Sequence, residues 1–296
     1  TIKVMNKGNI KKIKIKKLIL GCGGIENSRI LLWAKYNSKS GFLKNLPIGN
    51  YWMEHPSGDV GQFIGEKKRI LNLFSRNDKY YMTAPTSEFR KKKKINNIRY
   101  HFIFWEKNSS KKLKTYLKDL VCVAPNYGKK IVESIQKKQM VHCNAVLRFN
   151  TEQKSDFDNK IILSKTKVDD FGIPQIEIHW NIKEDVFNTL RIATEELGKQ
   201  FIIHDVGRIG IDRFVYDRTL KYIPDVYANW QHMGGTIMSF DKKLGVVDKN
   251  LKVHGTDNLY VVGSSVFPSG AGHWNSTFTI VQLSLRLADF LTTQNQ

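Results

Sequence analysis

The chain has 296 residues, of which 41% are hydrophobic and 11% are aromatic. This length allows one large domain or two ordinary domains, each with its own hydrophobic core. No run of roughly 18 apolar residues occurs, so the sequence predicts no transmembrane helix. The 48 Lys and Arg residues outnumber the 27 Asp and Glu residues and give a net charge of +21, which raises the hypothesis of a protein that binds nucleic acid or an anionic surface.

The positive charge has a second explanation in a general bias of the composition. Lys, Ile and Asn are all frequent, including at positions where almost any polar residue would serve. The sequence shows no zinc-finger spacing, no heptad repeat and no RNA-binding glycine–aromatic motif. Because charge alone is weak support for binding, we expect no nucleic-acid partner and interpret the basic run at 90–94 as a solvated loop. Binding to anionic surfaces stays open as an alternative function.

The cysteines indicate the compartment. Cys22, Cys122 and Cys143 are few and widely separated, which predicts neither a disulfide framework nor a metal site. Such a set is typical of a reducing compartment, so we expect a cytoplasmic protein. No signal peptide is visible, and we expect the start of the chain to be missing; the bacterial periplasm therefore stays open.

The first segment, residues 1–57, predicts a strand, a glycine turn and a helix in that order. Ile13 and Ile15 alternate with lysines as in an exposed strand, and the apolar run at 18–20 is typical of a buried strand. The sequence GCGG then predicts a tight turn before a helix that begins near Glu26. This order is that of a dinucleotide-binding unit, but the turn lacks the G-x-G-x-x-G fingerprint. An ordinary strand–helix corner is an equally open reading.

The middle segment predicts strands covered by a helix. Strand patterns occur at 96–105, 140–149, 160–164 and 174–180, and the sequence VDDFGIP between the last two predicts a hairpin turn. Residues 184–201 predict a helix with acidic residues in its first turn. Its apolar positions, at helical spacing, are Val186, Leu190, Ala193 and Leu197. The pattern indicates an α+β unit.

The last segment predicts an apolar strand at 259–262, a Gly-Ser-Ser loop and a helix from Phe278. The helix is apolar on nearly every side, which predicts that it is buried. The residues before it are of types that cap helix N-termini: Asn275, Ser276 and Thr277. The N-terminus of a buried helix favours negative charge, such as that of a reduced flavin.

Two polar residues could serve the oxidation of an alcohol. Removal of a hydride from the carbon requires a base for the hydroxyl proton and a donor that holds the oxygen. His232, just before a Gly-Gly turn, suits the first role because its unperturbed pKa of about 6.5 lies near working pH. Asn275 suits the second role. A structural histidine and a simple helix cap remain open alternatives for these two residues.

At these residues the sequence resembles the glucose–methanol–choline family of flavin-dependent oxidoreductases. The terminal run at 232–291 is similar to the family's signature, and the segments at 18–32, 48–56 and 152–180 are similar to its central segments. The resemblance implies an α/β plus α+β fold. It combines part of an FAD-binding Rossmann-like domain with an antiparallel-sheet substrate domain. The implied boundaries are 1–57 and 225–296 for the FAD domain and 58–224 for the substrate domain.

The resemblance also implies roles for single residues. His232 is the implied general base, and Asn275 is implied to bind the alcohol oxygen. The residues implied to contact FAD are Gly23, Gly24, Gly263, Ser264, Asn275, Ser276 and Thr277. His273 is a candidate for lining the substrate pocket or for pairing with a neighbour, and Trp274 is a candidate for packing or for stacking on a sugar. The implied partner is a small-molecule alcohol or sugar, and no metal is expected.

One departure from the family limits these expectations. The family begins with a glycine fingerprint that binds the ADP half of FAD, and no segment here corresponds to it. We therefore expect the catalytic half of an FAD-dependent alcohol or sugar oxidoreductase, without a full flavin site and inactive alone, with a separate chain or a missing segment supplying the rest. The alternative is a non-catalytic remnant that binds a carbohydrate or a partner chain.

Overall fold

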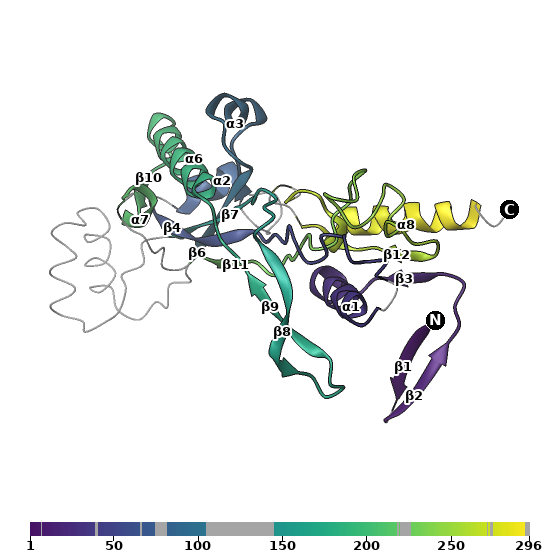
Figure 1. Ribbon diagram of the computed structural model, residues 1–296. Helices are drawn as coiled ribbons and strands as arrows, with labels where there is room; N and C mark the ends of the chain where they lie inside the picture. Colours follow the sequence, from purple (N-terminus) through teal and green to yellow (C-terminus); the bar gives the residue numbers. More distant parts are fainter. Residues whose placement is uncertain are drawn as a thin grey trace. The chain divides into compact units, whose positions relative to one another are not determined.

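The computed structural model describes most of the chain (Figure 1). The described residues are 1–6, 8–38, 41–65, 67–74, 82–104, 145–217, 219, 226–270, 272 and 275–293. They form two compact units, the first from 1–55, 153–182 and 230–296 and the second from 56–152 and 183–229. Residues 153–182, which the sequence placed in the substrate domain, thus have their contacts in the first unit. The function of each unit remains a prediction.

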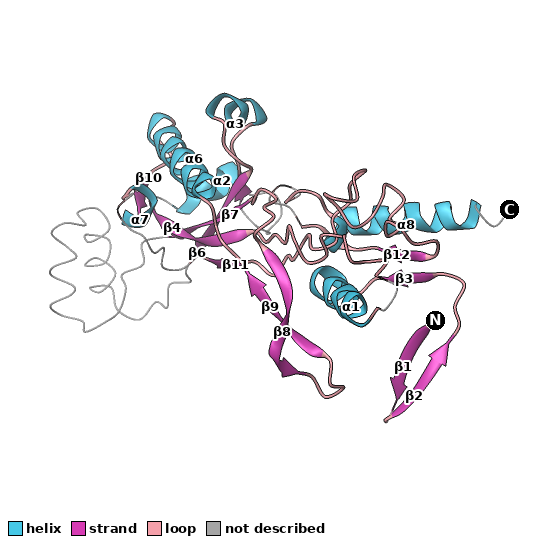
Figure 2. Ribbon diagram, viewed as in Figure 1, coloured by secondary structure: helices cyan, strands magenta, loops and turns pink. Residues whose placement is uncertain are grey.

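Three two-stranded sheets and two helices, of 15 and 17 residues, occur among the described residues of the first unit, and Figure 2 shows them coloured by type. Its elements are β1 (Ile2–Asn6), β2 (Asn9–Ile13), β3 (Leu18–Leu20), α1 (Gly23–Asn37), β8 (Lys160–Val168), β9 (Pro174–His179), β12 (Leu259–Val261), the 3-10 helix η1 (Ser264–Val266) and α8 (Thr277–Thr293). β1 pairs with β2 and β8 with β9, both antiparallel. β3 and β12 are parallel neighbours, so segments from the two ends of the chain form one sheet.

The core of the first unit lies between α1, α8 and the β3–β12 pair. Leu31 of α1, Leu287 of α8 and Val261 of β12 belong to one buried apolar cluster. α1 begins at Gly23, three residues earlier than predicted. Of the run at 18–20, only Leu20 is buried.

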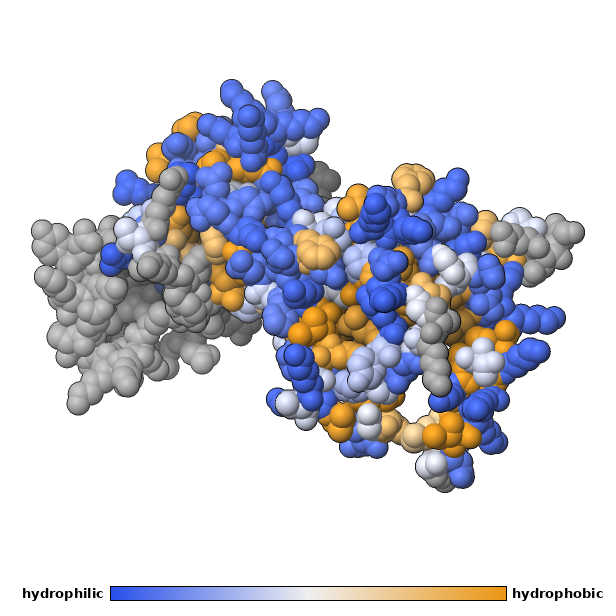
Figure 3. Space-filling model, viewed as in Figure 1, coloured by the Kyte–Doolittle hydropathy of each residue, from blue (hydrophilic) through white to orange (hydrophobic). Residues whose placement is uncertain are grey.

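The terminal helix α8 is less buried than predicted. Only Leu287 and Leu291 are buried, whereas Phe278 is 73% exposed and Leu285 is 56% exposed. The prediction of a helix buried on every side was therefore wrong for this chain. The physical reason is that one face packs on the core, while the described residues provide no partner for the other. Figure 3 shows apolar side chains reaching the described surface among hydrophilic ones.

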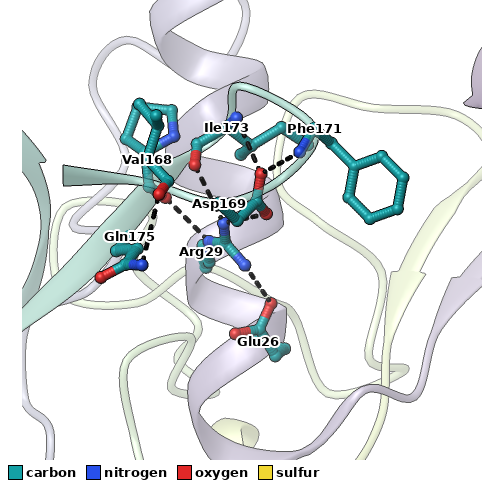
Figure 4. Close-up of polar contacts among 8 residues, drawn as sticks. Glu26, Arg29, Val168, Asp169, Phe171, Ile173 and Gln175 are labelled. Carbon is teal, nitrogen blue, oxygen red and sulfur yellow. Dashed lines mark hydrogen bonds and ion pairs between the residues drawn. The ribbon is translucent and has the colours of Figure 1, made fainter. Parts of the chain in front are cut away.

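An ion pair fastens the β8–β9 hairpin to α1 (Figure 4). Arg29 donates from Nη2 to Oδ2 of Asp169 at 2.6 Å and from Nε to the carbonyl of Pro174 at 2.8 Å. The other carboxylate oxygen of Asp169 accepts from the backbone N–H groups of Phe171 and Ile173. The hydrogen bond from Arg29 lowers the pKa of Asp169. The predicted turn at VDDFGIP is confirmed. Its first acidic residue, Asp169, has a structural role.

The second unit is built on an antiparallel sheet with the order β10-β4-β7-β6-β5, to which β11 adds by pairing with β4. Its elements are β4 (Pro56–Ile64), α2 (Lys67–Phe74), β5 (Met82–Thr83), α3 (Ser87–Lys93), β6 (Ile98–Phe104), β7 (Ala145–Thr151), α6 (Glu184–Ile203), β10 (Arg208–Ile211), α7 (Arg213–Tyr216) and β11 (Tyr227–Ala228). The chain as a whole is therefore a mixed α/β protein with antiparallel sheets.

The predicted elements of the second unit are largely confirmed. α6 places Val186, Leu190 and Ala193 in buried positions, and it lies along one side of the sheet in Figure 1. Strands form at the predicted patterns around 98–104 and 145–151, whereas 140–144, Cys122 and Cys143 lie outside the described residues. The basic run at 90–94 is not a loop. It forms the end of α3, which Thr86 caps through its side chain.

Among the described residues, no helix is long and apolar enough to cross a membrane.

Candidate active site around His232

His232 lies in a segment whose backbone packs closely against two other parts of the first unit. Two glycines with positive φ follow it, Gly234 at +74° and Gly235 at +87°. A Cβ atom at Gly234 would lie 2.0 Å from the carbonyl oxygen of Tyr51, and one at Gly235 would lie 2.3 Å from Oγ of Ser28. Only glycine combines this conformation with this approach. The turn therefore sets the position of His232 against the segment at 48–56 and against α1.

Two tryptophans border the imidazole of His232. The ring stacks on Trp52, with centroids 5.7 Å apart and an interplanar angle of 29°, and Trp52 is buried. Trp230 meets the imidazole edge to face at 6.3 Å and is 83% exposed. The His232 side chain itself is 26% exposed. The imidazole is thus packed on one face and still open to solvent.

A buried carboxylate lies at one nitrogen of this imidazole. Nδ1 of His232 is 2.9 Å from Oε2 of Glu54, and the Glu54 side chain is 0% exposed. The oxygen lies off the direction of the ring N–H bond, so the contact is an ion-pair approach and not a well-aligned hydrogen bond. No hydrogen bond to Nε2 of His232 is formed by any residue that the structure describes. The carboxylate therefore faces Nδ1 and leaves Nε2 available.

Backbone donors hold this carboxylate in place. Oε1 of Glu54 accepts from the N–H of Gln231 at 2.8 Å and from the N–H of His55 at 2.9 Å. Oε2 accepts from the same Gln231 N–H at 3.1 Å. Sequence reasoning missed Glu54, although the MEHP segment had been compared with the family. The available signal was an acidic residue inside the segment 48–56, which is similar to a central segment of the family.

The backbone of His232 is held by residues predicted to contact FAD. Oγ of Ser264 donates to the carbonyl oxygen of His232 at 2.6 Å. A Cβ atom at Gly24 would lie 2.4 Å from the same oxygen. Gly24 and Ser264 thus converge on His232, and the Ser264 hydroxyl proton is already engaged. Their contact with a cofactor remains a prediction.

The two glycine turns after β3 and β12 are joined by a buried side chain that sequence reasoning also missed. Asn27 donates from Nδ2 to the carbonyl of Val262 at 3.0 Å and to Oγ of Ser265 at 2.9 Å. Its Oδ1 accepts from the N–H of Cys22 at 2.8 Å. Gly23 and Gly263, the other glycines predicted to contact FAD, lie in the turns that Asn27 connects.

Asn275 forms the turn that starts α8. Its Oδ1 accepts from the backbone N–H of Thr277 at 2.9 Å and from the Thr277 hydroxyl. No described residue accepts a hydrogen bond from Nδ2 of Asn275. Ser276 lies between Asn275 and Thr277, and its carbonyl accepts from the N–H of Ile280. The cap role of this segment is therefore confirmed, whereas its catalytic and cofactor roles stay predictions.

Not every predicted residue is brought together. Among the described residues, no hydrogen bond or ring contact joins Asn275 to His232. His273 and Trp274 lie outside the described residues. No cluster of His, Cys, Asp or Glu that could hold a metal occurs in the described part of the chain, and Cys22 is a free, exposed thiol.

Comparison with known proteins shows which proteins this chain resembles. Residues 156–284 match the family model described as GMC oxidoreductase. The chain is 26% identical over 284 residues to the fructose dehydrogenase large subunit of Gluconobacter japonicus, a match that covers 94% of this chain and 47% of that protein. Residues 156–284 are therefore similar to the carboxy-terminal domain of GMC oxidoreductases. The chain spans about half the length of the relatives it matches.

Solved structures of similar fold also match this chain over about half of their own length. Pyridoxine 4-oxidase from Mesorbium loti superposes with a TM-score of 0.56 at 14% identity, over 97% of this chain and 53% of that one. A formate oxidase variant from Aspergillus oryzae gives a TM-score of 0.55 at 14% identity, over 94% of this chain and 54% of that one. At such low identity these likenesses show the fold alone.

Proposed function

We propose that this chain forms the catalytic and substrate-binding part of an FAD-dependent oxidoreductase that acts on the CH–OH group of an alcohol or sugar. The observation that carries the proposal is the geometry of His232. One ring nitrogen faces a buried, backbone-held carboxylate at 2.9 Å, while the side chain is still 26% exposed. A base that must accept a proton from a small molecule needs this combination of a fixed ring and an accessible nitrogen.

The glycine turns after β3 and β12 fit the cofactor that the family implies. A Cβ atom at Gly23 would meet no atom within 4 Å, and one at Gly263 would meet only Nδ2 of Asn27, at 3.7 Å. Both turns follow the carboxyl ends of adjacent parallel strands, where α/β folds bind their ligands. When bound, FAD would accept the hydride that leaves the carbinol carbon. Gly23, Gly24, Gly263 and the first turn of α8 are the groups we assign to hold it.

The residues of the chain handle the proton and the oxygen of the substrate. Nε2 of His232 takes the hydroxyl proton as the C–H bond electrons leave with the hydride, so that the alcohol becomes a carbonyl compound. Nδ2 of Asn275 donates to the substrate oxygen, and the turn to Thr277 fixes the amide for this purpose. Exclusion of water around the ring comes from Trp52, which covers one face of the imidazole.

A sugar is the substrate class that we favour. The exposed Trp230 beside His232 offers a flat aromatic face, on which the apolar side of a sugar ring packs well. The relative from Gluconobacter japonicus is named a fructose dehydrogenase, which agrees with this choice. That relative is also named a large subunit, and we propose a partner chain for this protein as well.

The partner or segment that we propose completes the flavin site and covers α8. The exposed apolar residues Phe278, Val281 and Leu285 follow each other at helical spacing on one side of this helix. An uncovered apolar stripe of this kind marks an interaction surface. We assign it to the segment that supplies the glycine fingerprint for the ADP half of FAD.

Anaerobic flavin reduction tests the proposed function. The FAD-loaded protein is mixed with a panel of sugars, simple alcohols and sugar acids, and the loss of the visible flavin absorption is recorded. Bleaching by sugars with formation of the matching carbonyl product is expected. Two results would instead indicate the non-catalytic remnant. In one, the protein takes up no FAD even together with the segment that carries the glycine fingerprint; in the other, no compound of the panel reduces the bound flavin. Carbohydrate binding would then be measured next.

A further inference from the structure

We propose that Glu54 is a positioning residue for His232: its buried carboxylate holds the imidazole as the Nδ1–H tautomer, so that Nε2 carries the lone pair that accepts the substrate proton. This inference rests on the proposed function of His232 as the base. It adds a residue that the family resemblance did not assign.

Backbone groups hold the carboxylate of Glu54 independently of the His232 side chain. The N–H groups of Gln231 and His55 hold it from one side at 2.8 and 2.9 Å. The backbone N–H of Glu54 itself donates to Oε1 of Gln153 at 3.3 Å, which anchors the main chain at this point. The side chain is completely buried. The carboxylate is therefore a fixed acceptor.

The carboxylate sets which nitrogen of His232 carries the proton. An ionised carboxylate is an acceptor only, and a neutral imidazole carries one N–H and one lone pair. If Nδ1 carried the lone pair, two electron-rich atoms would lie 2.9 Å apart. The Nδ1–H tautomer removes this repulsion, even though the N–H bond is not directed at Oε2. The tautomer of His232 is thus set by its neighbour, as in other catalytic histidines with a buried carboxylate.

A positioning role of Glu54 can be separated from a purely structural one. Glu54 also joins two loops, because its carboxylate accepts from Gln231 on one segment and from His55 on its own. In the variant Glu54→Gln, an amide oxygen can still accept these backbone bonds. The amide NH₂ group, however, would face Nδ1 as a donor and would favour a lone pair there. This variant should therefore keep the loops joined and invert the tautomer.

Nitrogen NMR of selectively ¹⁵N-histidine-labelled, FAD-loaded protein reads the tautomer directly. The signals of His232 are identified by their absence in His232→Gln. We expect the Nδ1–H tautomer in the wild type and the Nε2–H tautomer in Glu54→Gln. Flavin reduction should fall by roughly 10²- to 10⁴-fold in that variant, with little change in KM for the substrate.

The matched control is Gln153→Met. Gln153 anchors the same segment through Glu54 and through Trp180, whose Nε1 donates to it at 2.9 Å. This change should lower thermal stability and leave the tautomer of His232 unaltered, since the carboxylate of Glu54 stays in place.

Two results would overturn the inference. One is an Nε2–H tautomer in the wild type, a result that counts even if Glu54→Gln fails to fold. The other is a folded Glu54→Gln variant with an unaltered tautomer and normal flavin reduction. Failure of the proposed role of His232 as the base gives a different result. In that case the flavin of His232→Gln would also be reduced at the normal rate.

Discussion

Asn275 is the residue at which a structural and a catalytic role can be separated most simply. Its Oδ1 caps the start of α8 and its Nδ2 is left as a donor. We predict that Asn275→Ala slows flavin reduction and also lowers the free energy of unfolding by about 1 kcal/mol, the usual cost of a lost cap. Asn275→Asp keeps the cap acceptor but removes the donor, so it should slow reduction without this loss of stability. Normal reduction by Asn275→Asp would leave Asn275 the cap role only.

His101 on β6 makes the second unit sensitive to acid. Burial, together with the charges of Arg99 and Arg148, lowers the pKa of His101 to about 4. The unfolded chain has a histidine pKa of about 6.5 and binds the proton first, so the stability from neutral His101 is complete above that value and is lost as the pH falls towards 4. We predict that the melting temperature of the wild type falls more than that of His101→Gln between about pH 7 and about pH 4.5. An equal fall in melting temperature for the wild type and for His101→Gln would contradict the assignment of this acid sensitivity to His101.

At the residue scale, the types and positions of His232 and Asn275 made them candidates, but they left a structural histidine and a simple helix cap equally open. The resemblance to the family assigned the two catalytic roles, which stay predictions. Glu54 could not be found in this way. It reaches His232 because segments 177 residues apart in sequence, at Glu54 and Gln231, meet in the folded first unit. No local pattern encodes such a meeting. Asn27 was missed for the same reason.

At the scale of elements, the approach of α1 to the His232 segment depends on Gly24. A Cβ atom at Gly24 would lie 2.4 Å from the carbonyl oxygen of His232, which is a backbone atom and cannot move aside as a flexible side chain could. We predict that Gly24→Ala lowers the free energy of unfolding by about 1–3 kcal/mol, as overpacking does. The same change should slow flavin reduction, because the backbone of His232 has to move. Chemical unfolding and stopped-flow absorbance measure the two effects.

Gly198 in α6 provides the matched control for this change. A Cβ atom at Gly198 would meet no neighbouring atom within 4 Å. Because glycine is a poor residue for a helix interior, Gly198→Ala should raise the free energy of unfolding by roughly 0.5–1 kcal/mol. Flavin reduction should stay unchanged. If Gly24→Ala behaved like Gly198→Ala, the close packing on His232 would be refuted.

Elements with a regular apolar period were the predictable part of the fold. The helix α6 and the strands β6, β8 and β9 follow their sequence patterns closely. The burial of α8 was predicted wrongly, because apolar residues all around a helix favour burial but do not show that any described segment covers every side. The prediction of a loop for the basic run at 90–94 was wrong, because the interpretation considered the charge of the lysines and not their helical propensity.

For the molecule as a whole, the uncovered side of α8 tests how the site is completed. We predict that Leu285→Glu leaves the stability of the chain within about 0.5 kcal/mol, as exposed substitutions do, but weakens association with the segment that carries the glycine fingerprint. Gln282→Glu, an exposed change with the same charge on the same helix, should not weaken it. Co-purification and FAD content measure the association. Equal FAD content in both variants would exclude this surface as the docking face.

The central claim is that His232 is the base of an FAD-dependent alcohol or sugar oxidation. The most direct measurement is the rate of anaerobic flavin reduction by the best sugar of the panel, for the FAD-loaded wild type and for His232→Gln. We predict that the rate of flavin reduction in His232→Gln is lowered by roughly 10²- to 10⁴-fold, while its FAD content and melting temperature equal those of the wild type. An unchanged rate of flavin reduction in His232→Gln would contradict it.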